Sequence, residues 1–497
     1  MSHKDHILIL HPKDHVGVAL RTFESGDYAG EILIQEPILP GHKIALTDIR
    51  EGEIIRKYGY SIGRATSPIR PGEWVHSHNL RTALDETPAY AYHPQRVEPS
   101  HKGPACTRTF MGYIRENGDV GIRNEIWIIN TVGCVNKTAE RLAQMANDNL
   151  GRPGINGFYA FSHPYGCSQL GDDLHTTQQI LARLVHHPNA AAVLILGLGC
   201  ENNQVSDFAN VIGPVSTDRI RYLTAQNVED EWTTGLDLLQ ELADYASHFQ
   251  AEPIPLSRLV VGLKCGGSDG FSGITANPLV GMVSDRLVSL GATTILTEVP
   301  EMFGAERILM DRAENDEVFT ETVALINQFK DYFIRHGEVI YENPSPGNKD
   351  GGITTLEEKS LGCIQKSGTT PVRDVLSYGE PVHRSGLNLL QAPGNDAVSV
   401  TALAASGAHL ILFTTGRGTP FGGPVPTLKI STNSELARRK AGWIDFNAGD
   451  VLHASDRNRL ANDLFEQIIS VASGQALVKN EQRGFREIAI FKDGVTL

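Results

Sequence analysis

The sequence has few cysteines, no long apolar run and no excess of basic residues. Six cysteines in 497 residues are too few for a disulfide-stabilised scaffold, and a reducing compartment would keep them as thiols. No stretch reaches the ~20 apolar residues that span a bilayer, and the amino terminus carries His and Asp where a signal peptide needs an apolar segment. We therefore expect a cytoplasmic protein.

The charge balance excludes some classes of partner. Acidic residues outnumber basic ones by 58 to 44, which gives a net charge of −14. Such a field repels phosphate backbones and anionic lipids, so neither nucleic acid nor a membrane is an expected partner. Apolar residues make up 41% and charged residues 21%, as in soluble globular proteins. The composition is compatible with a homo-oligomer but does not demand one.

Periodicity predicts a multidomain α/β protein with a small N-terminal all-β domain. Residues 1–85 contain short alternating strands separated by Gly, Pro and Asp. Residues 86–106 lack apolar periodicity and suit an extended linker. Beyond them, apolar strands alternate with amphipathic helices, which is typical of largely parallel sheets. We place a second α/β domain at 107–250 and a C-terminal α/β domain at 256–497, separated by a Pro-containing stretch.

Reactive residues follow the strands of these α/β domains. The expected strands are 125–132, 157–163, 191–198, 258–265, 293–300 and 409–416. Almost every following loop combines Gly with a reactive or polar side chain. Ligands of open α/β sheets bind beyond the carboxyl ends of the strands, where loops and helix amino termini meet. The pattern therefore predicts one shared site.

Four cysteines occupy like positions at strand ends. Cys134, Cys167, Cys200 and Cys265 follow one another at intervals of 33, 33 and 65 residues, which are about one, one and two β-plus-α units. Thiolates gathered at a sheet edge suit iron, zinc or an iron–sulfur cluster. The alternative is that each is a small buried core residue. Cys106 and Cys363 lack this context and are left unassigned.

Two histidine motifs add possible ligands and proton-transfer groups. His76 and His78 lie at i and i+2, on one face of a strand, where two imidazoles can hold one divalent metal; exposed polar alternation is the alternative. His163, Tyr165 and Cys167 place an imidazole, a phenol and a thiol on one loop, which suits proton transfer. A structural turn is the competing interpretation.

Two stiff, Gly-flanked loops each present one cation. Lys349 and Arg417 suit an anionic ligand, with Arg417 able to bind a carboxylate through two hydrogen bonds. Asn277 begins a helix as its N-cap, where the helix dipole favours anions, although a simple cap explains it equally. There is no Walker A motif and no correctly placed GxGxxG, so a dinucleotide cofactor is not expected.

Longer strings resemble a known family. YGCSQLGDD (165–173), GLGCENN (197–203), CGGSDGFSGITANP (265–278), ENPSPGNK (342–349) and TTGRGTPFGG (414–423) resemble the altronate/galactarate dehydratase family, and the likeness covers essentially the whole chain. It implies an N-terminal SAF-type (β-clip) domain and a hydro-lyase that dehydrates D-altronate to 2-dehydro-3-deoxy-D-gluconate in hexuronate breakdown. Galactarate is the alternative substrate, and a non-catalytic sugar-acid-binding protein is the alternative of another class.

The resemblance also implies dependence on Fe²⁺, or Mn²⁺ in its place. We expect the metal between the SAF-type domain and the strand-end loops, bound by His76, His78 and some of the four cysteines. Three thiolates holding a [4Fe–4S] cluster are the alternative. His163 is the candidate base at C2 of the substrate, and Tyr165 or His42 the acid. Substrate binding is assigned to Lys43, Lys349, Arg417 and Asn277, the last at its helix start.

Overall fold

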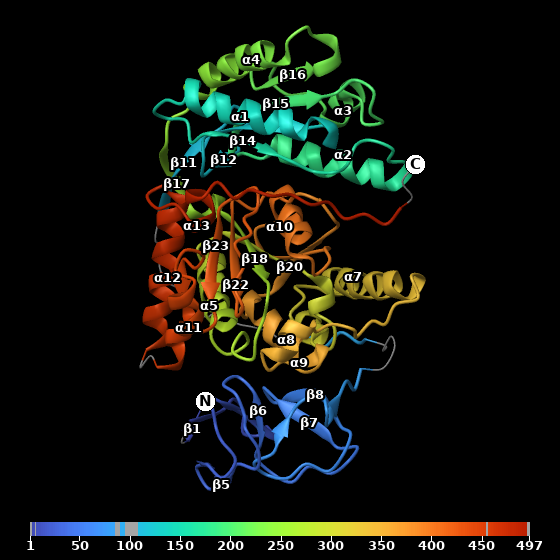
Figure 1. The fold of residues 1–497 in the computed structure, drawn as a ribbon, viewed down its shortest axis with the longest axis vertical. Coiled ribbons are helices and arrows are strands. Elements are labelled where there is room, and N and C mark those ends of the chain that lie inside the picture. The colour runs from blue at the N-terminus through green and yellow to red at the C-terminus, as the bar shows by residue number, and fades with distance from the viewer. Residues whose placement is uncertain (1, 5, 85–89, 95–107, 454–455, 495–497) are drawn as a thin grey trace.

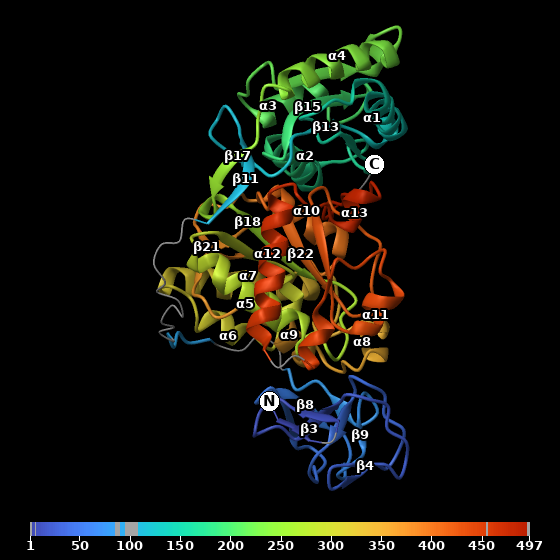
Figure 2. The same ribbon diagram turned by 90° about the vertical axis from the view of Figure 1, so that its left-hand side faces the viewer.

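The computed structural model describes all residues except 1, 5, 85–89, 95–107, 454–455 and 495–497. Most of the predicted linker 86–106, with Cys106, therefore lies outside the described residues. Three bodies follow one another along the longest axis of the molecule (Figure 1). The N-terminal β domain lies at one end, the C-terminal domain in the middle and the second domain at the other end, an arrangement that the perpendicular view repeats (Figure 2).

The N-terminal domain consists of short antiparallel strands. Its main sheet has the order β1-β2-β3-β6-β9, and a second sheet has the order β10-β8-β7. All of their pairings are antiparallel. The strands are β1 (Ser2–Lys4), β2 (Ile7–Ile9), β3 (Val16–Ala19), β4 (Tyr28–Ala29), β5 (Ile32–Leu33), β6 (Lys43–Ala45), β7 (Ile54–Lys57), β8 (Tyr60–Ala65), β9 (Trp74–Val75) and β10 (Leu80–Arg81).

The second domain is built on a four-stranded parallel sheet of order β14-β13-β15-β16. Its elements are β11 (Thr109–Ile114), β12 (Val120–Gly121), β13 (Glu125–Asn130), α1 (Asn136–Leu150), β14 (Phe158–Phe161), α2 (Gly171–His186), β15 (Ala190–Gly197), α3 (Val205–Ile212), β16 (Ile220–Thr224), α4 (Glu231–Ala246) and β17 (Glu252–Pro255). Every residue of β15 is buried, which is typical of a central parallel strand covered on both faces.

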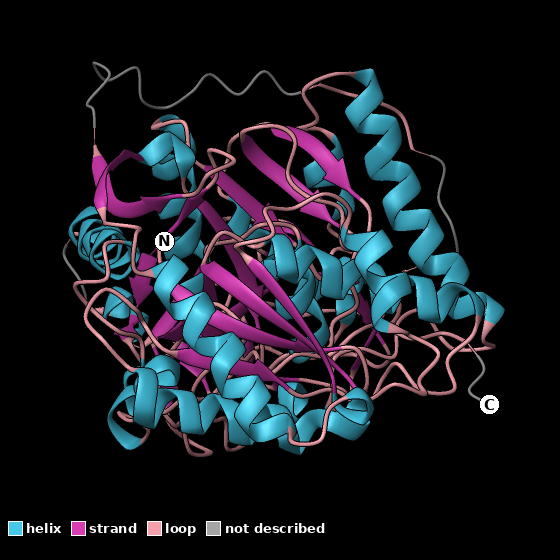
Figure 3. Ribbon diagram, turned by 90° about the horizontal axis from the view of Figure 1, so that it is seen from above, coloured by secondary structure: helices cyan, strands magenta, loops and turns pink. Residues whose placement is uncertain are grey.

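The C-terminal domain has a seven-stranded parallel sheet of order β20-β21-β19-β18-β22-β23-β24. Seen from above, helices surround the strands of the molecule (Figure 3). Its strands are β18 (Val260–Cys265), β19 (Thr293–Leu296), β20 (Val372–Leu376), β21 (Gly386–Leu390), β22 (Leu410–Thr415), β23 (Thr427–Ser431) and β24 (Phe446–Asn447). Its helices are α5 (Ala276–Ser289), α6 (Glu306–Met310), α7 (Asp316–Arg335), α8 (Pro346–Asp350), α9 (Leu356–Cys363), α10 (Asp396–Ala405), α11 (Ser434–Arg439), α12 (Arg457–Ala472) and α13 (Lys479–Gln482). The predicted multidomain α/β fold with an antiparallel N-terminal domain is confirmed.

The second and C-terminal domains share one apolar core. Side chains of α2 and of α10 belong to the same buried cluster, together with Trp127 of β13 and Phe413 of β22. The C-terminal segment runs between the two domains (Figure 1). There the Tyr165 hydroxyl donates to the Ile490 carbonyl, 2.9 Å away, and the Asp173 carboxylate accepts from the backbone N–H of Asp493. The strand-end loops of both domains are thereby held in fixed positions.

Candidate active site

A cavity of about 740 Å³ opens at the carboxyl ends of three adjacent parallel strands, β21, β19 and β18. Loops that leave neighbouring parallel strands reach the same sheet edge, which is why segments far apart in sequence meet here. The polar residues that line the cavity are Cys265, Glu301, Asn343, Ser345, Asn348, Lys359, Asn395 and Asp396. Phe491 of the C-terminal segment closes part of the apolar wall.

Two thiols, a carboxylate and two ammonium groups form one contact group at this cavity, and we call it the Cys265 cluster: Cys265, Glu301, Lys359, Cys363 and Lys366. The sulfur of Cys265 lies 2.9 Å from Glu301 Oε2, 3.3 Å from the sulfur of Cys363 and 2.9 Å from Lys366 Nζ. Lys359 Nζ lies 2.8 Å from Glu301 Oε1. All five residues are buried.

Contacts within the cluster shift the pKa values of its members. A hydrogen bond from Cys363 lowers the pKa of Cys265 to about 6, and the ammonium groups of Lys366 and Lys264 act in the same direction. The pKa of Cys363 is correspondingly raised. Burial alone would raise the pKa of Glu301, but Lys359 and Lys366 outweigh burial and lower it. The ammonium groups and the Cys363 hydrogen bond thus favour the Cys265 thiolate, whereas burial and the Glu301 carboxylate, to which Cys265 can donate as a thiol, oppose it.

A second buried layer supports the Cys265 backbone. Glu298 accepts a hydrogen bond from the N–H of Cys265 and is ion-paired with Lys264, whose ammonium group also lies 2.8 Å from Asp396 Oδ1. Glu298 has a φ of +70°, a left-handed conformation that costs energy in a residue other than glycine. Burial raises the pKa of Glu298 above its ordinary value. Strain and perturbed carboxyl groups of this kind are concentrated at functional sites.

The N-terminal domain docks against the segment that forms one wall of the cavity. His76 Nε2 donates to the Lys349 carbonyl at 2.9 Å, and His42 Nε2 donates to the Asp350 carbonyl at 3.2 Å. His42 Nδ1 accepts from the Trp74 indole. Burial, with Lys43 and His76 nearby, lowers the pKa of His42 to about 4. These hydrogen bonds favour a docking role for both histidines.

Lys43 anchors the same interface. Its ammonium group donates to the Gly352 carbonyl, the Thr354 hydroxyl and Glu358 Oε2, all within 2.8 Å. Lys57 approaches the other oxygen of Glu358, at 2.8 Å. With three partners and a fully buried position, Lys43 has no donor left for the substrate that the sequence assigned to it.

The remaining predicted binding residues lie around the cavity rather than inside it. Asn277 is not the predicted N-cap, because α5 begins at Ala276 with Thr275 as its N-cap. The Asn277 side chain is buried, donates to the Gly362 carbonyl and accepts from Thr414. Lys349 lies next to Asn348, which lines the cavity. Arg417 is exposed, and its backbone N–H donates to the Gly267 carbonyl.

His163 and Tyr165 belong to the second domain. His163 is 2% exposed; its Nε2 donates to the Asn130 carbonyl at 2.9 Å, and its Nδ1 accepts from the Tyr165 N–H. Tyr165 binds the C-terminal segment through its hydroxyl. Because both imidazole nitrogens are used internally, this geometry favours a structural role for His163 over the predicted role as the base.

The six predicted metal ligands do not meet at one centre. His76 and the exposed His78 lie in the N-terminal domain, at one end of the molecule (Figure 1). Cys134, Cys167 and Cys200 are exposed in the second domain, at the other end, and Cys265 is buried in the domain between them. The expected common centre is corrected accordingly, because the three groups lie in three different domains.

Sequence reasoning missed most of the Cys265 cluster. Lys359, Cys363 and Lys366 lie at i, i+4 and i+7, so one helical face carries all three, and this spacing was a usable signal. Glu298 and Glu301 follow β19 (Thr293–Leu296) in the same way that the predicted cysteines follow their strands. Only the tertiary structure shows that these carboxylates pair with lysines.

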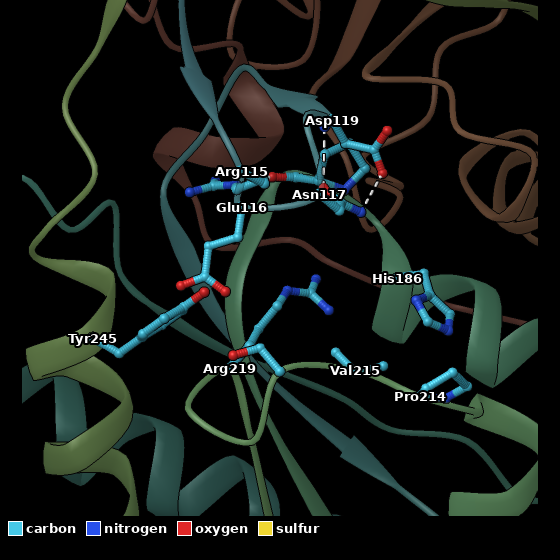
Figure 4. A pocket seen from close by; sticks show the side chains of 11 residues that line it. Arg115, Glu116, Asn117, Asp119, His186, Pro214, Val215, Arg219 and Tyr245 are labelled. Carbon is cyan, nitrogen blue, oxygen red and sulfur yellow. Dashed lines mark hydrogen bonds between the residues drawn. The ribbon is translucent and has the colours of Figure 1, made fainter.

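A smaller cavity of about 290 Å³ lies within the second domain (Figure 4). Arg115 beside it donates to the carbonyls of Pro188 and Arg123 and to the side chain of Asn124. Burial and the neighbouring Glu116 carboxylate raise the pKa of Tyr245 to about 12. The hydrogen bonds of Arg115 hold the β11–β12 segment onto the parallel sheet, so we assign this cavity a structural role.

Three sequence profiles match the chain. The altronate/galactarate dehydratase SAF domain matches residues 5–83, the second domain of D-galactarate dehydratase/altronate hydrolase matches 112–247, and the C-terminal domain of D-galactarate/altronate dehydratase matches 256–496. The chain belongs to the altronate/galactarate dehydratase family. The Cys265 cluster thus lies in the C-terminal domain of this family, and the histidine interface joins that domain to the SAF domain.

Characterised relatives match over nearly the full length. An altronate dehydratase of Bacillus subtilis is 52% identical, covering 98% of this chain and 99% of its own. An altronate dehydratase of Escherichia coli is 49% identical, covering 98% and 99%. A galactarate dehydratase (L-threo-forming) of Escherichia coli is 34% identical, covering 97% and 96%. In the part of the chain that the structure describes, no helix is long and apolar enough to cross a bilayer.

Proposed function

We propose that this chain dehydrates D-altronate to 2-dehydro-3-deoxy-D-gluconate and water in the cavity beside the Cys265 cluster. Membership of a dehydratase family supports hydro-lyase activity, and the two relatives near 50% identity, both altronate dehydratases, favour altronate over galactarate. The observation that carries the location is the convergence of a lowered-pKa thiol, a carboxylate and lysine ammonium groups at one sheet edge.

The reaction requires a base and positive charge. A base removes the proton at C2, the hydroxyl at C3 leaves with a proton as water, and the resulting enol becomes the 2-keto acid. A proton next to a carboxylate is very weakly acidic, so the intermediate is a doubly negative ene-diolate. Fixed positive groups around that intermediate are the main means of lowering the barrier.

The Cys265 cluster meets these requirements. Cys265 is the proposed base, since Lys366 and the Cys363 hydrogen bond lower the pKa of its thiol and the sulfur borders the cavity. Lys359 also borders the cavity, and we assign its ammonium group to the substrate carboxylate and to the charge that develops on it. Ser345 and Asn343 line the same space and suit the sugar hydroxyls.

The same contacts decide whether a divalent ion fits this cavity. Cys265, Glu301 and Cys363 place one ligand atom each within 4.8 Å of one another, a donor set soft enough for iron. However, Lys366 already holds the Cys265 sulfur and Lys359 already holds Glu301. A dication would have to displace or approach two ammonium groups, so these residues do not fit it, and we derive no step from a metal here.

Two variants test the proposal. Cys265→Ser keeps the size of the side chain but loses the thiolate, and we expect kcat to fall by roughly 10²- to 10⁴-fold, as for loss of a general base. Exchange of the C2 proton with deuterated solvent should be lost as well. Lys359→Met should raise KM and lower kcat, whereas Lys137→Met, at an exposed lysine, is the matched control and should change neither.

Formation of the 2-keto acid from altronate is measured with thiobarbiturate or semicarbazide. A folded Cys265→Ser protein with wild-type turnover would remove Cys265 as the base. Tight altronate binding by the wild type without keto acid would favour the non-catalytic sugar-acid-binding alternative. Faster turnover of galactarate would reassign the substrate.

A further inference from the structure

Three cysteines are presented together at the surface of the second domain. Cys134, Cys167 and Cys200 are all exposed, whereas Cys265 and Cys363 are buried. Exposed free cysteines are unusual, because a thiol without a ligand is normally a small buried residue. Three of them in one domain indicate a function that needs access to their sulfurs.

The three cysteines follow three neighbouring strands. Cys134 comes after β13, Cys167 after β14 and Cys200 after β15, and β13 pairs in parallel with both of the others. Their loops therefore leave the same sheet edge side by side. Cys265, which the sequence grouped with them, belongs to the other sheet.

Hydrogen bonds lock the loops to one another. The N–H of Gly133 donates to the Tyr165 carbonyl, and the N–H of Asn203 donates to the Gly166 carbonyl at 3.1 Å. Thr131 donates its hydroxyl hydrogen to Glu201 at 2.6 Å. Each loop is thus bonded to another, so the cysteine positions are fixed by the fold before any ligand arrives.

The closeness of two of these loops depends on a glycine. Gly166 has a φ of +96°, and a Cβ there would lie 1.9 Å from the Thr131 carbonyl oxygen. Only glycine therefore allows the Cys167 loop to lie against the loop of Cys134. The residue immediately before Cys167 therefore has a left-handed backbone conformation.

Each of the three cysteines comes shortly before the amino terminus of a helix. Helix α1 begins at Asn136, α2 at Gly171 and α3 at Val205, so each cysteine lies within five residues before a helix amino terminus. Helix amino termini stabilise negative charge placed near them. Gln226 adds a side-chain N–H donor 3.7 Å from the Cys200 sulfur. An anionic group bound through several thiolates is accordingly suited to this edge.

The three exposed cysteines are not preset for a single ion. Within the described ranges, the only thiol, imidazole and carboxylate ligands that meet three together within 4.8 Å are those of Cys265, Glu301 and Cys363. A single zinc ion with Zn–S bonds of about 2.3 Å needs its sulfurs roughly that close. Cys134, Cys167 and Cys200 do not all lie within this distance of one another, so they do not form a preset site for a single ion.

We infer that Cys134, Cys167 and Cys200 bind a [4Fe–4S] cluster at this edge, with the fourth iron left without a protein thiolate. The site is separate from the Cys265 cavity, so it goes beyond the proposed catalytic site and can fail independently of it.

The test is metal and sulfide analysis of the full-length protein, purified without oxygen and, where iron is low, reconstituted with ferrous iron and sulfide. We expect about four iron and about four acid-labile sulfide per chain, with a broad visible absorption that bleaches on reduction. Cys134→Ser, Cys167→Ser and Cys200→Ser should each lose most of both. Cys363→Ser, at a buried cysteine of the other domain, and Ser168→Ala, beside Cys167, should keep both.

Thermal unfolding of each variant establishes that the second domain is folded, which keeps the comparison valid. Iron without sulfide, or zinc in place of iron, would overturn the assignment. So would a reconstituted wild type without iron, or equal loss of iron from Cys363→Ser. Turnover is measured separately and decides only whether the cluster takes part in the reaction.

Discussion

Glu358 is a buried carboxylate in the interface between the SAF and C-terminal domains, and we expect its charge to contribute strongly to the free energy of unfolding. One carboxylate serves two fully buried ammonium groups, Lys43 and Lys57, each 2.8 Å from one of its oxygens. Burial acts against ionisation, but the two lysines lower the pKa of Glu358 from 4.5 to about 2. That difference corresponds to about 3 kcal/mol of folding free energy. Because the folded pKa is depressed, this contribution is complete above pH 4.5 and is lost as the pH falls through 2.

Glu358→Gln keeps the shape of the side chain and removes the charge. It leaves two buried ammonium groups without a counter-ion, and breaking a buried pair in this way costs about 3 to 5 kcal/mol. Denaturant unfolding at pH 7 measures the loss. The matched control is Glu435→Gln, whose exposed i,i+4 pair with Arg439 should cost less than about 1 kcal/mol.

The pH dependence tests the mechanism rather than the size of the effect. Burial already lowers the pKa of Lys43 to about 8, and loss of Glu358 should lower it further. A neutral amine needs no counter-ion, so the deficit of Glu358→Gln should shrink as the pH rises from 7 to about 9. A loss no larger than that of Glu435→Gln, or a deficit that is constant with pH, would refute the reasoning.

Three further predictions concern the two candidate sites. Because Cys265 must be ionised to act as a base, kcat/KM for altronate should fall about tenfold per pH unit below its pKa of about 6, and a flat profile down to pH 5 would contradict this. Gly166→Ala should lower stability by about 1 to 3 kcal/mol more than Gly154→Ala, since both have φ near +90° but only Gly166 would clash; equal melting temperatures would argue against it. His163→Ala should lose about 2 to 4 kcal/mol of stability in denaturant unfolding yet still exchange the C2 proton of altronate with solvent; loss of exchange in the folded variant would restore His163 as the base.

The sequence predicted the strands that are apolar throughout. The strands expected at 125–132, 191–198 and 409–416 correspond to β13, β15 and β22, because parallel strands covered on both faces form continuous apolar runs. It did not locate β20, β21 or β23. Their segments carry Arg373, Asn388 and Lys429, and in such segments partners in the sheet rather than local composition decide strand formation.

The candidate sites, like the strands, have features that the local sequence predicted and features that it did not. Local sequence sufficed to place reactive side chains at strand ends, because a strand followed by a Gly-rich loop can be identified from neighbouring residues alone. It could not tell which strands share a sheet: Cys134, Cys167, Cys200 and Cys265 look alike in sequence, yet three belong to one sheet and one to another.

What the amino-acid sequence determined by itself was therefore the fold class, the family and the chemical kind of each side chain. Only the tertiary structure decided which charges meet. Glu301 reaches Lys359 and Glu358 reaches Lys43 across long stretches of chain, and a buried ion pair depends on a few ångströms that no local pattern specifies. Sheet order and domain docking set the distances between groups that are remote in sequence. The predicted single centre is therefore replaced by a candidate catalytic cavity, a docking interface and a cysteine-bearing edge.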